Sequence, residues 1–291
     1  DRYTVLFDPA LVDDRSRLLA ELAAADAIIV RNRTQVDVEL LAAAPQLKAV
    51  GRLGVGLDNI DIAACKERGV AVHPATGANA LAVAEYVIAS LLMLFRGAYQ
   101  SKEGMVGGEW PRADLQGRET SGKWLALIGL GGIARLVAER AAALGMKVSA
   151  VDPFLAEDDP AWEGVTRSDS VADVLTGADA VSLHVPLTDG TRHILNEETL
   201  ALLAPGAVVV NTARGGIVAE AALVAAIRGG HVAGAALDVF EDEPLTATGG
   251  EVFAGLDNVV LTPHIAGHTA ESNSRVSDVT VANVLTTRTS K

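Results

Sequence analysis

A glycine-rich turn follows an apolar run near the middle of the chain. The apolar residues 124–128 lead into Gly129-Leu130-Gly131-Gly132-Ile133-Ala134, and an Ala-rich stretch of helical character comes next. In this pattern Gly129 permits a tight turn, Gly131 allows a pyrophosphate to approach the backbone, and Ala134 lets the helix pack closely on the strand. The turn therefore predicts a dinucleotide site at a helix N-terminus in a parallel α/β sheet.

A carboxylate follows the next expected strand at the spacing that ribose recognition requires. Residues 147–151 end at Asp152, close to the ~20-residue offset at which an acidic side chain accepts hydrogen bonds from the adenosine ribose. The same charge would repel a 2′-phosphate, and Pro153 and Phe154 provide no cation to offset it. We therefore expect NAD, rather than NADP, as the cofactor.

Short apolar strands alternate with Ala-rich helices along most of the chain, which is typical of parallel sheets with crossover helices. A first group of strands is expected at residues 4–7, 27–30, 49–52 and 70–73, with helices at 17–24, 38–43 and 62–68. A long helix at 79–100 and a glycine-rich linker at 104–122 separate it from six strands at 124–128, 147–151, 180–183, 207–211, 234–238 and 259–262. The 291 residues are long enough for two α/β domains, each with a Rossmann-like, doubly wound sheet.

Charge and cysteine content exclude several classes of function. The net charge is −13, with 24 Lys and Arg against 37 Asp and Glu and no basic run, which argues against nucleic-acid binding. Cys65 is the only cysteine, so no internal disulfide and no cysteine-based metal site is expected, and the histidine spacing fits no metal motif. The apolar residues 83–95 are too few for a membrane span, and no export signal is recognised. We expect a cytoplasmic protein without a metal or a membrane anchor.

Three expected strands end in polar segments, where the ligands of open α/β sheets gather. These segments are residues 211–216, 238–244 and 262–268. With the glycine-rich turn they resemble the D-isomer-specific 2-hydroxyacid dehydrogenases, most closely the phosphoglycerate dehydrogenase branch. Residues 50–61 resemble the substrate loop of that family, and Asn79 with residues 83–85 resembles the start of its interdomain helix. The resemblance covers nearly the whole chain and implies an NAD-dependent oxidoreductase of small 2-hydroxy acids.

The resemblance also implies a catalytic set of three residues. His264 would be the acid/base, since a histidine titrating near neutrality can take the hydroxyl proton when a hydride leaves C2. Glu243 would hold one tautomer of that histidine and raise its pKa. Arg214 would bind the substrate carboxylate and the C2 oxygen with its fork of donors, which Lys cannot reproduce.

Further binding residues are expected in both halves of the chain. Backbone N–H groups around Leu53, Gly54 and Val55 would form an anion-binding nest for the substrate carboxylate, and Arg52 and Arg31 would meet a second anionic group. Asp238 would lie near the nicotinamide amide. The expected cofactor contacts are Val55, Gly129, Gly131, Gly132, Ile133, Asp152, Val185, Pro186, Thr191, Thr212, Ala213, Asp238, His264 and Gly267. The expected substrate contacts are Arg31, Arg52, Leu53, Gly54, Asn79 and Arg214.

The domain layout that we expect is discontinuous. Residues 1–96 and 269–291 would form the substrate domain, and residues 97–268 would form an inserted NAD-binding domain. Two departures from the family pattern stand out: Gly132 replaces a frequent Arg, and residues 264–268 lack the usual pair of consecutive glycines. With no cation at residue 132, phosphate contacts there depend on the backbone, and weaker NAD binding is expected. A homodimer is implied by resemblance.

Several alternatives remain open on the sequence. A formate dehydrogenase is disfavoured because that family pattern uses Gln where this chain has Glu243, whereas a phosphite dehydrogenase keeps a similar triad. An NAD-sensing co-regulator without enzymatic activity would share the fold, and a methyltransferase would leave Glu243 and His264 without a task. Candidate substrates are 3-phosphoglycerate, 3-sulfolactate, and hydroxypyruvate or glyoxylate in the reverse direction.

Overall fold

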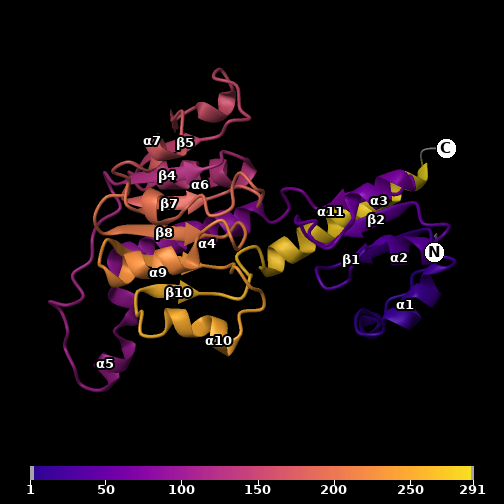
Figure 1. The fold of residues 1–291 in the computed structure, drawn as a ribbon, viewed down its shortest axis with the longest axis horizontal. Helices are drawn as coiled ribbons and strands as arrows, with labels where there is room; N and C mark the ends of the chain where they lie inside the picture. Colours follow the sequence, from indigo (N-terminus) through magenta and orange to yellow (C-terminus); the bar gives the residue numbers. More distant parts are fainter. Residues whose placement is uncertain (1–2, 290–291) are drawn as a thin grey trace. The chain divides into compact units, whose positions relative to one another are not determined.

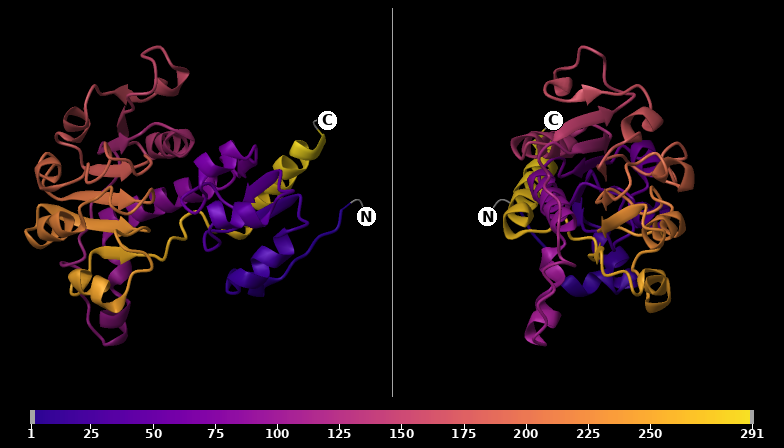
Figure 2. Two further views of the ribbon diagram at one scale, coloured as in Figure 1. Left: turned by 45° about the vertical axis from the view of Figure 1, so that its right-hand side comes forward. Right: turned by 90° about the vertical axis from the view of Figure 1, so that its left-hand side faces the viewer.

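The computed structural model describes residues 3–289 and divides the chain into two compact units. The first unit takes Asp1–Asn79 and His268–Lys291, and the second takes Ala80–Gly267. The first unit is thus built from both ends of the chain, with the second inserted as one continuous segment (Figures 1 and 2).

The first unit contains a three-stranded parallel sheet. Strands β1 (Ala27–Val30), β2 (Ala49–Arg52) and β3 (Ala71–Pro74) lie side by side in chain order. Helices α1 (Arg15–Leu22), α2 (Val38–Ala43) and α3 (Ile62–Glu67) each begin after an aspartate whose side chain accepts a backbone N–H of the first turn. These caps, Asp14, Asp37 and Asp61, fix the three helix starts. A 3-10 turn at Pro9–Val12 precedes α1.

Helices α1, α2 and α3 pack on one face of this small sheet, and the C-terminal helix α11 (Ala270–Thr289) covers the opposite face. It approaches β2 so closely that a Cβ on Gly51 would lie 2.6 Å from Val284 and 2.8 Å from Thr280. Thr280 also donates its hydroxyl to the Arg52 carbonyl at 3.2 Å. A side chain larger than hydrogen at residue 51 would therefore push α11 off the sheet.

The second unit contains a seven-stranded parallel sheet of order β10-β9-β8-β7-β4-β5-β6. Figure 1 labels β10, β8, β7, β4 and β5 of this sheet in the same order. The order reverses between β4 and β7, which makes this sheet doubly wound and creates a switch point at the carboxyl ends of these strands. The strands are β4 (Trp124–Ile128), β5 (Lys147–Val151), β6 (Thr166–Arg167), β7 (Ala180–Leu183), β8 (Ala207–Asn211), β9 (Val232–Leu237) and β10 (Val259–Leu261).

Helices cover both faces of this sheet. Alternate residues of β4 point to opposite faces, so that Leu125 and Leu127 join one buried cluster and Ala126 and Ile128 join another. Helices α4 (Ala80–Arg96) and α6 (Gly132–Ala143) pack in the first of these clusters, while α7 (Val171–Leu175), α8 (Glu197–Leu200) and α9 (Glu220–Arg228) pack in the second. Each fully buried Leu contributes roughly 2 kcal/mol of hydrophobic stabilisation. The sheet therefore lies between two apolar layers of helices.

The domain boundary lies earlier than the sequence predicted. Helix α4 belongs to the second unit rather than to the first, because Ala84, Val87, Leu91 and Phe95 are buried against the large sheet and α6. The expected boundary at residue 96 is therefore displaced to residue 79, whereas the second boundary, expected at 268, falls after residue 267.

A few expected elements differ from those observed. Residues 4–7 form no strand, and Val5, Leu6 and Phe7 are exposed. The two-residue strand β6 was not expected, and the predicted linker begins with helix α5 (Lys102–Val106), after a 3-10 turn at Ala98–Gln100. The remaining short helices are Pro160–Trp162, α10 (Ala247–Gly250) and Glu251–Phe253.

Candidate functional site

The glycine-rich turn lies at the switch point of the large sheet. Gly129 has a φ of 88°, and a Cβ there would lie 2.7 Å from the His184 carbonyl oxygen. Only glycine fits this left-handed, crowded position between the ends of β4 and β7. At the start of α6, by contrast, a Cβ on Gly131 or Gly132 would meet no described atom within 4 Å, and Gly131 provides no side-chain cap. This arrangement leaves an open cradle at a helix N-terminus.

Asp152 follows β5 and faces this turn. One carboxylate oxygen accepts the Leu130 N–H at 2.9 Å, and the other accepts the Phe154 N–H at 3.0 Å. Each carboxylate oxygen has two lone pairs, so the side chain can hold the turn in place and still accept a ribose hydroxyl. Only the second of these roles was expected from the sequence.

The other expected cofactor residues of the second unit follow β7, β8, β9 and β10, whereas Val55 follows β2 in the first unit. The Thr191 hydroxyl donates to the Pro186 carbonyl at 2.6 Å and fixes the segment after Val185. The buried Thr212 Oγ1 has no hydrogen-bond partner among the described residues, although the neighbouring Ala213 N–H donates to Asn211. A buried hydroxyl without a partner costs free energy unless a ligand satisfies it. The open cradle and this hydroxyl fit a bound dinucleotide, which the expected residues of this unit would hold.

His264 and Glu243 are paired directly. The His264 Nδ1 lies 2.8 Å from Glu243 Oε2, and Glu243 Oε1 accepts the Phe240 N–H at 3.1 Å. Both side chains are partly accessible, with 51% and 35% of their surfaces exposed. A carboxylate that accepts at Nδ1 keeps a proton on that nitrogen and leaves Nε2 available to exchange a proton with a ligand.

The pair shifts the pKa of each partner. The hydrogen bond that His264 donates to Glu243 raises the pKa of His264 above its ordinary value, and the charges of Glu243 and Asp238 act in the same direction, against burial and the Arg214 charge. Burial works to raise the pKa of Glu243, but the hydrogen bonds from His264 and Phe240 outweigh it, and the net result is a lowered pKa. The pair therefore favours a histidine that gains a proton readily beside an ionised carboxylate.

Arg214 lies in the loop after β8. Asn211 Nδ2 donates to the Arg214 carbonyl at 3.0 Å, and an Arg214 guanidinium nitrogen donates to the Ala213 carbonyl at 2.6 Å. The next residue, Gly215, packs so closely on the segment after β9 that a Cβ would overlap the Phe240 carbonyl. The Arg214 charge acts on both His264 and Glu243, so the structure brings the three expected catalytic residues into one electrostatic cluster.

Asp238 has a structural task that the sequence analysis missed. Its side chain is 1% exposed and accepts the Thr262 hydroxyl, the Ile265 N–H and the Ala266 N–H at 2.6–2.8 Å. Its backbone carbonyl accepts the His264 N–H at 2.9 Å. Asp238 thus organises the loop that carries His264. The sequence pattern that could have predicted this role is an aspartate at the end of one strand and a Thr-Pro-His segment at the end of the next.

Three expected substrate residues of the first unit, Arg52, Leu53 and Gly54, lie at the end of β2 and in the tight turn that follows it. Gly54 has a φ of 146°, and a guanidinium nitrogen of Arg52 donates to the Leu53 carbonyl at 2.5 Å. The expected anion nest is wrong for two of its donors, because the Leu53 N–H donates to Val30 and the Gly54 N–H donates to Arg52. These donors are consumed by anchoring the turn to β1 and to itself, which sequence spacing does not reveal.

Asn79 and Arg31 lie elsewhere in the first unit. The Asn79 Oδ1 is buried without a hydrogen-bond partner among the described residues, which suits a residue that binds a ligand. The side chain of Asn59, 6% exposed, donates to the Arg31 and Thr34 carbonyls and shapes the segment after β1. The role of Asn59 was not expected from the sequence.

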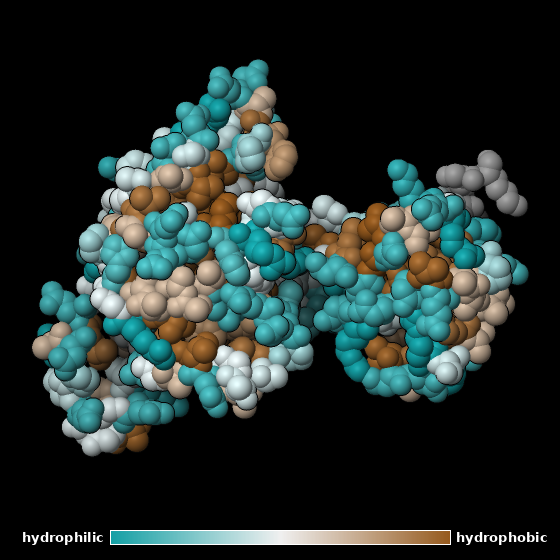
Figure 3. Space-filling view, in the orientation of Figure 1, coloured by the Kyte–Doolittle hydropathy of each residue, from teal (hydrophilic) through white to brown (hydrophobic). Residues whose placement is uncertain are grey.

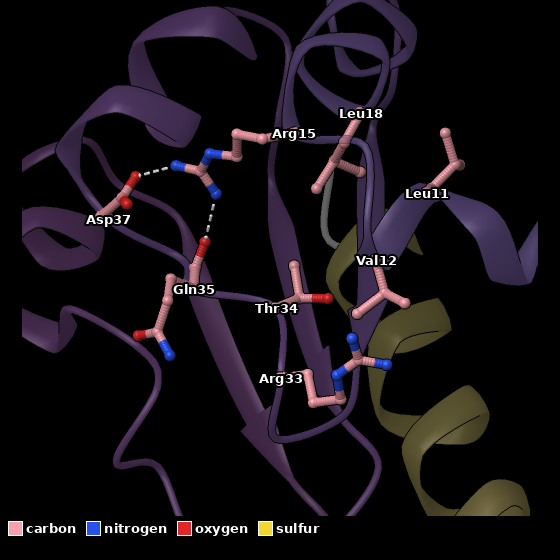
Figure 4. Close-up of a pocket in the computed structure, with 8 residues that line it drawn as sticks. All are labelled: Leu11, Val12, Arg15, Leu18, Arg33, Thr34, Gln35 and Asp37. Carbon is pink, nitrogen blue, oxygen red and sulfur yellow. Dashed lines mark hydrogen bonds and ion pairs between the residues drawn. The ribbon is translucent and has the colours of Figure 1, made fainter.

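A cavity of about 200 Å³ in the first unit is lined by none of the expected site residues (Figure 4). Its lining residues are Leu11, Val12, Arg15, Leu18, Arg33, Thr34, Gln35 and Asp37. Arg15 donates to Asp37 at 2.5 Å and to the Gln35 carbonyl at 2.8 Å, and Arg33 pairs with Asp13. These charges are neutralised within the protein, and the cavity gains no ligand assignment.

The histidines outside the pair contact other protein groups. Burial lowers the pKa of His184 to about 4, and its Nε2 lies 3.0 Å from the Ser182 hydroxyl. His73 contacts Thr287, and His268 contacts Asn273. Within residues 3–289 no cluster of three or more His, Cys, Asp or Glu side chains is arranged for a metal ion, and none of the helices there has the length and hydropathy of a membrane span.

All strands of the large sheet run parallel, so the turn after β4 and the polar segments after β8, β9 and β10 meet at one edge of the sheet. A dinucleotide cradle beside a proton-exchanging histidine is what hydride transfer between NAD and an alcohol requires. Fold and site therefore define an NAD-dependent dehydrogenase. Residues 88–266 match the NAD-binding domain of the D-isomer-specific 2-hydroxyacid dehydrogenases, and the chain belongs to this family.

Individual relatives agree with this assignment. An (S)-sulfolactate dehydrogenase of Chromohalobacter salexigens is 58% identical over 281 residues, covering 97% of this chain and 90% of the relative. A D-3-phosphoglycerate dehydrogenase of Mycobacterium leprae is 44% identical over 262 residues, 90% of this chain, which spans only 49% of that relative. The crystal structure of D-lactate dehydrogenase from Aquifex aeolicus, complexed with NAD and lactic acid, superposes with a TM-score of 0.79 at 33% identity, covering 92% of this chain and 85% of the other.

Proposed function

We propose that this enzyme interconverts 3-sulfolactate and 3-sulfopyruvate with NAD. The observation that carries the proposal is the paired His264 and Glu243 next to Arg214, in a chain that is 58% identical to an (S)-sulfolactate dehydrogenase over nearly its full length. The similarity to D-3-phosphoglycerate dehydrogenases is lower and covers about half of their length, which ranks 3-phosphoglycerate second.

The chemistry at C2 follows from the residues of the second unit. Bound NAD supplies the acceptor for the hydride that leaves C2. His264 Nε2 takes the proton of the C2 hydroxyl, and Glu243 stabilises the imidazolium through Nδ1. Arg214 binds the carboxylate and the C2 oxygen, whose negative charge it stabilises as the C–H bond breaks. In the reverse direction the imidazolium returns its proton to the new hydroxyl.

The S descriptor of the relative and the D-isomer family describe the same handedness. In lactate the carboxylate outranks the methyl group, whereas in sulfolactate the sulfur-bearing C3 outranks the carboxylate. This exchange of priorities turns the descriptor from R to S without moving any group. We infer that the enzyme acts on the D-like arrangement at C2, with the C3 sulfonate in place of the lactate methyl.

We assign the second anionic group of the substrate to Arg52 and Arg31. The Arg52 guanidinium folds back over the turn and donates to the Leu53 carbonyl. It lies so close to Gly54 that a Cβ on that residue would contact it, and this packing orients the guanidinium. Sulfonate and phosphate both present three acceptor oxygens to such a fork, while glyoxylate and pyruvate present none at this position. Arg52 should therefore contribute to selectivity among 2-keto acids.

The test is the oxidation of NADH, followed at 340 nm, with 3-sulfopyruvate, 3-phosphohydroxypyruvate, hydroxypyruvate, glyoxylate and pyruvate. We expect the highest kcat/KM with 3-sulfopyruvate, loss of turnover in His264→Ala, and a preference for 3-sulfopyruvate over pyruvate that shrinks in Arg52→Ala. A higher kcat/KM with 3-phosphohydroxypyruvate or hydroxypyruvate would overturn the substrate assignment. Binding of NADH without turnover of any acid would instead support the co-regulator alternative.

We further propose that the protein is a cytoplasmic homodimer. Apolar and aromatic side chains of Tyr99, Met105, Val106 and Trp110 are exposed on and around α5. Figure 3 shows hydrophobic atoms among hydrophilic ones on this segment, at the lower left. Exposed apolar patches of this kind favour association. Light scattering on the wild type and on Val106→Glu tests this, and a monomeric wild type would refute it.

A further inference from the structure

A chain of short hydrogen bonds joins helix α4 to the loop that carries His264. The Tyr86 hydroxyl lies 2.6 Å from Thr262 Oγ1, and Thr262 Oγ1 donates to Asp238 Oδ1 at 2.6 Å. All three residues belong to the second unit, and Asp238 is 1% exposed. Neither Tyr86 nor Thr262 is among the residues that the catalytic cycle uses directly.

The chemistry of the three groups fixes the direction of both hydrogen bonds. Asp238 already accepts two backbone N–H groups, so its carboxylate acts as an acceptor toward Thr262 as well. Thr262 has a single hydroxyl proton and donates it to Asp238. The Thr262 oxygen must therefore accept from Tyr86. Burial raises the pKa of Tyr86 more than its hydrogen bonds with Thr262 and Ser90 lower it, which keeps this hydroxyl protonated and able to donate near neutral pH.

The far end of this chain sets the backbone of the acid/base histidine. His264 has a φ of 55°, a left-handed conformation that costs a non-glycine residue roughly 1 kcal/mol or more. The Asp238 carbonyl holds the His264 N–H, and the Asp238 carboxylate holds the next two N–H groups. The loop stays in this conformation because Asp238 is itself held in place, and the Thr262 hydroxyl donates a hydrogen bond to its carboxylate.

We propose that Tyr86 is a positioning residue for His264, acting through Thr262 and Asp238. The proposal rests on the proposed function in that it takes His264 as the acid/base. Hydrogen bonds in a chain strengthen one another, so the Tyr86 donor makes the Thr262 hydroxyl a better donor to Asp238. The carboxylate is thereby fixed, and part of its negative charge is compensated.

The charged groups that act on His264 are Glu243, Asp238 and Arg214. Asp238 favours the protonated imidazole, so any loss of compensation at its carboxylate strengthens that effect. Removing the Tyr86 hydroxyl should therefore raise the pKa of His264. The ring of Tyr86 remains in Tyr86→Phe, so packing on α4 is retained.

The experiment combines a double-mutant cycle with a direct titration. Tyr86→Phe, Thr262→Val and the double variant are compared with the wild type, and Tyr3→Phe, which alters an exposed tyrosine of the first unit, is the matched control. The readouts are kcat and KM for the acid and for NADH, and the His264 pKa from carbon-13 NMR of labelled histidines. His264→Asn assigns the resonance among the six histidines, and a thermal melt of each variant reports on folding.

We expect Tyr86→Phe to lower kcat by about threefold to tenfold with KM values changed by less than about twofold, and to raise the His264 pKa. In the Thr262→Val background the same substitution should have no further effect, because the link to Asp238 is already broken. An unchanged His264 pKa in Tyr86→Phe, or additive effects in the cycle, would overturn the proposal. The NMR titration needs no substrate, so it decides the proposal even if no acid is turned over and the proposed function fails.

Discussion

Glu243→Gln tests the central pair of the site at a single atom. Both Glu243 oxygens accept a hydrogen bond, one from His264 Nδ1 and one from the Phe240 N–H. Glutamine has one acceptor oxygen, so its amide group must face one of these two donors. If the amide faces His264, the imidazole takes the tautomer with its proton on Nε2, which cannot accept the substrate proton.

The size of the effect follows from the geometry. A hydrogen bond to a charged group contributes about 1.5–3 kcal/mol, and the 2.8 Å bond between half-accessible side chains should lie toward the lower part of that range. We expect kcat for oxidation of the hydroxy acid to fall by roughly 10–100-fold, since about 1.4 kcal/mol corresponds to a factor of ten.

The pH profile gives the second readout. Oxidation needs neutral His264, so the low-pH limb of kcat/KM reports the His264 pKa, which Glu243 raises. Removing the carboxylate lowers that pKa, so the low-pH limb of oxidation should move to lower pH. Reduction needs the imidazolium, and its high-pH limb should move to lower pH as well.

The assay follows NADH at 340 nm in both directions across pH 5.5–10, with Glu241→Gln as the matched control. Glu241 is exposed, and its acceptor contact to the Glu220 N–H can be kept by a glutamine oxygen. Activity of the control should stay within about twofold of the wild type. If Glu243→Gln keeps its full kcat and both limbs stay in place, the pairing of His264 with Glu243 has no catalytic role.

Three further predictions address other parts of the second unit. Arg214→Lys should lower kcat/KM by roughly 10–100-fold because the point charge of a lysine cannot replace the two parallel hydrogen bonds of a guanidinium. A variant whose steady-state kcat/KM equals that of the wild type would contradict this. Gly215→Ala should destabilise the protein by about 1–3 kcal/mol because its Cβ would overlap the Phe240 carbonyl, and an unchanged thermal melting curve would contradict it. Gly132→Arg should tighten NADH binding by about threefold to tenfold, since the site has room for a side chain beside the pyrophosphate cradle, and calorimetry that shows equal or weaker binding would rule this out.

The sequence predicted the parts of the fold that local patterns determine. The strands at 124–128 and 147–151 and the turn after the first of them agree with β4, β5 and the Gly129 turn, because apolar runs and a glycine at a tight turn are local signals. The pairing of His264 with Glu243 followed from family resemblance and is present in the structure.

The features that the sequence did not predict depend on contacts between residues that are far apart in the chain. Helix α4 is apolar over much of its surface, and its sequence does not say which sheet it will cover. The N–H groups of Leu53 and Gly54 are ordinary donors until the fold places carbonyls beside them. The link from Tyr86 to Thr262 spans 176 positions and carries no periodic signal.

The discontinuous first unit has a consequence for the order of events during synthesis. Residues 80–267 form a continuous unit, whose chain is complete before α11 has been made. Until α11 arrives, the face of β2 at Gly51 lacks the helix that supplies Thr280 and Val284, and the first half of the unit carries uncovered apolar surface. Domains fold as units as they emerge from the ribosome, so the nucleotide-binding unit can fold first. The first unit can be completed only afterwards, when α11 packs on its sheet.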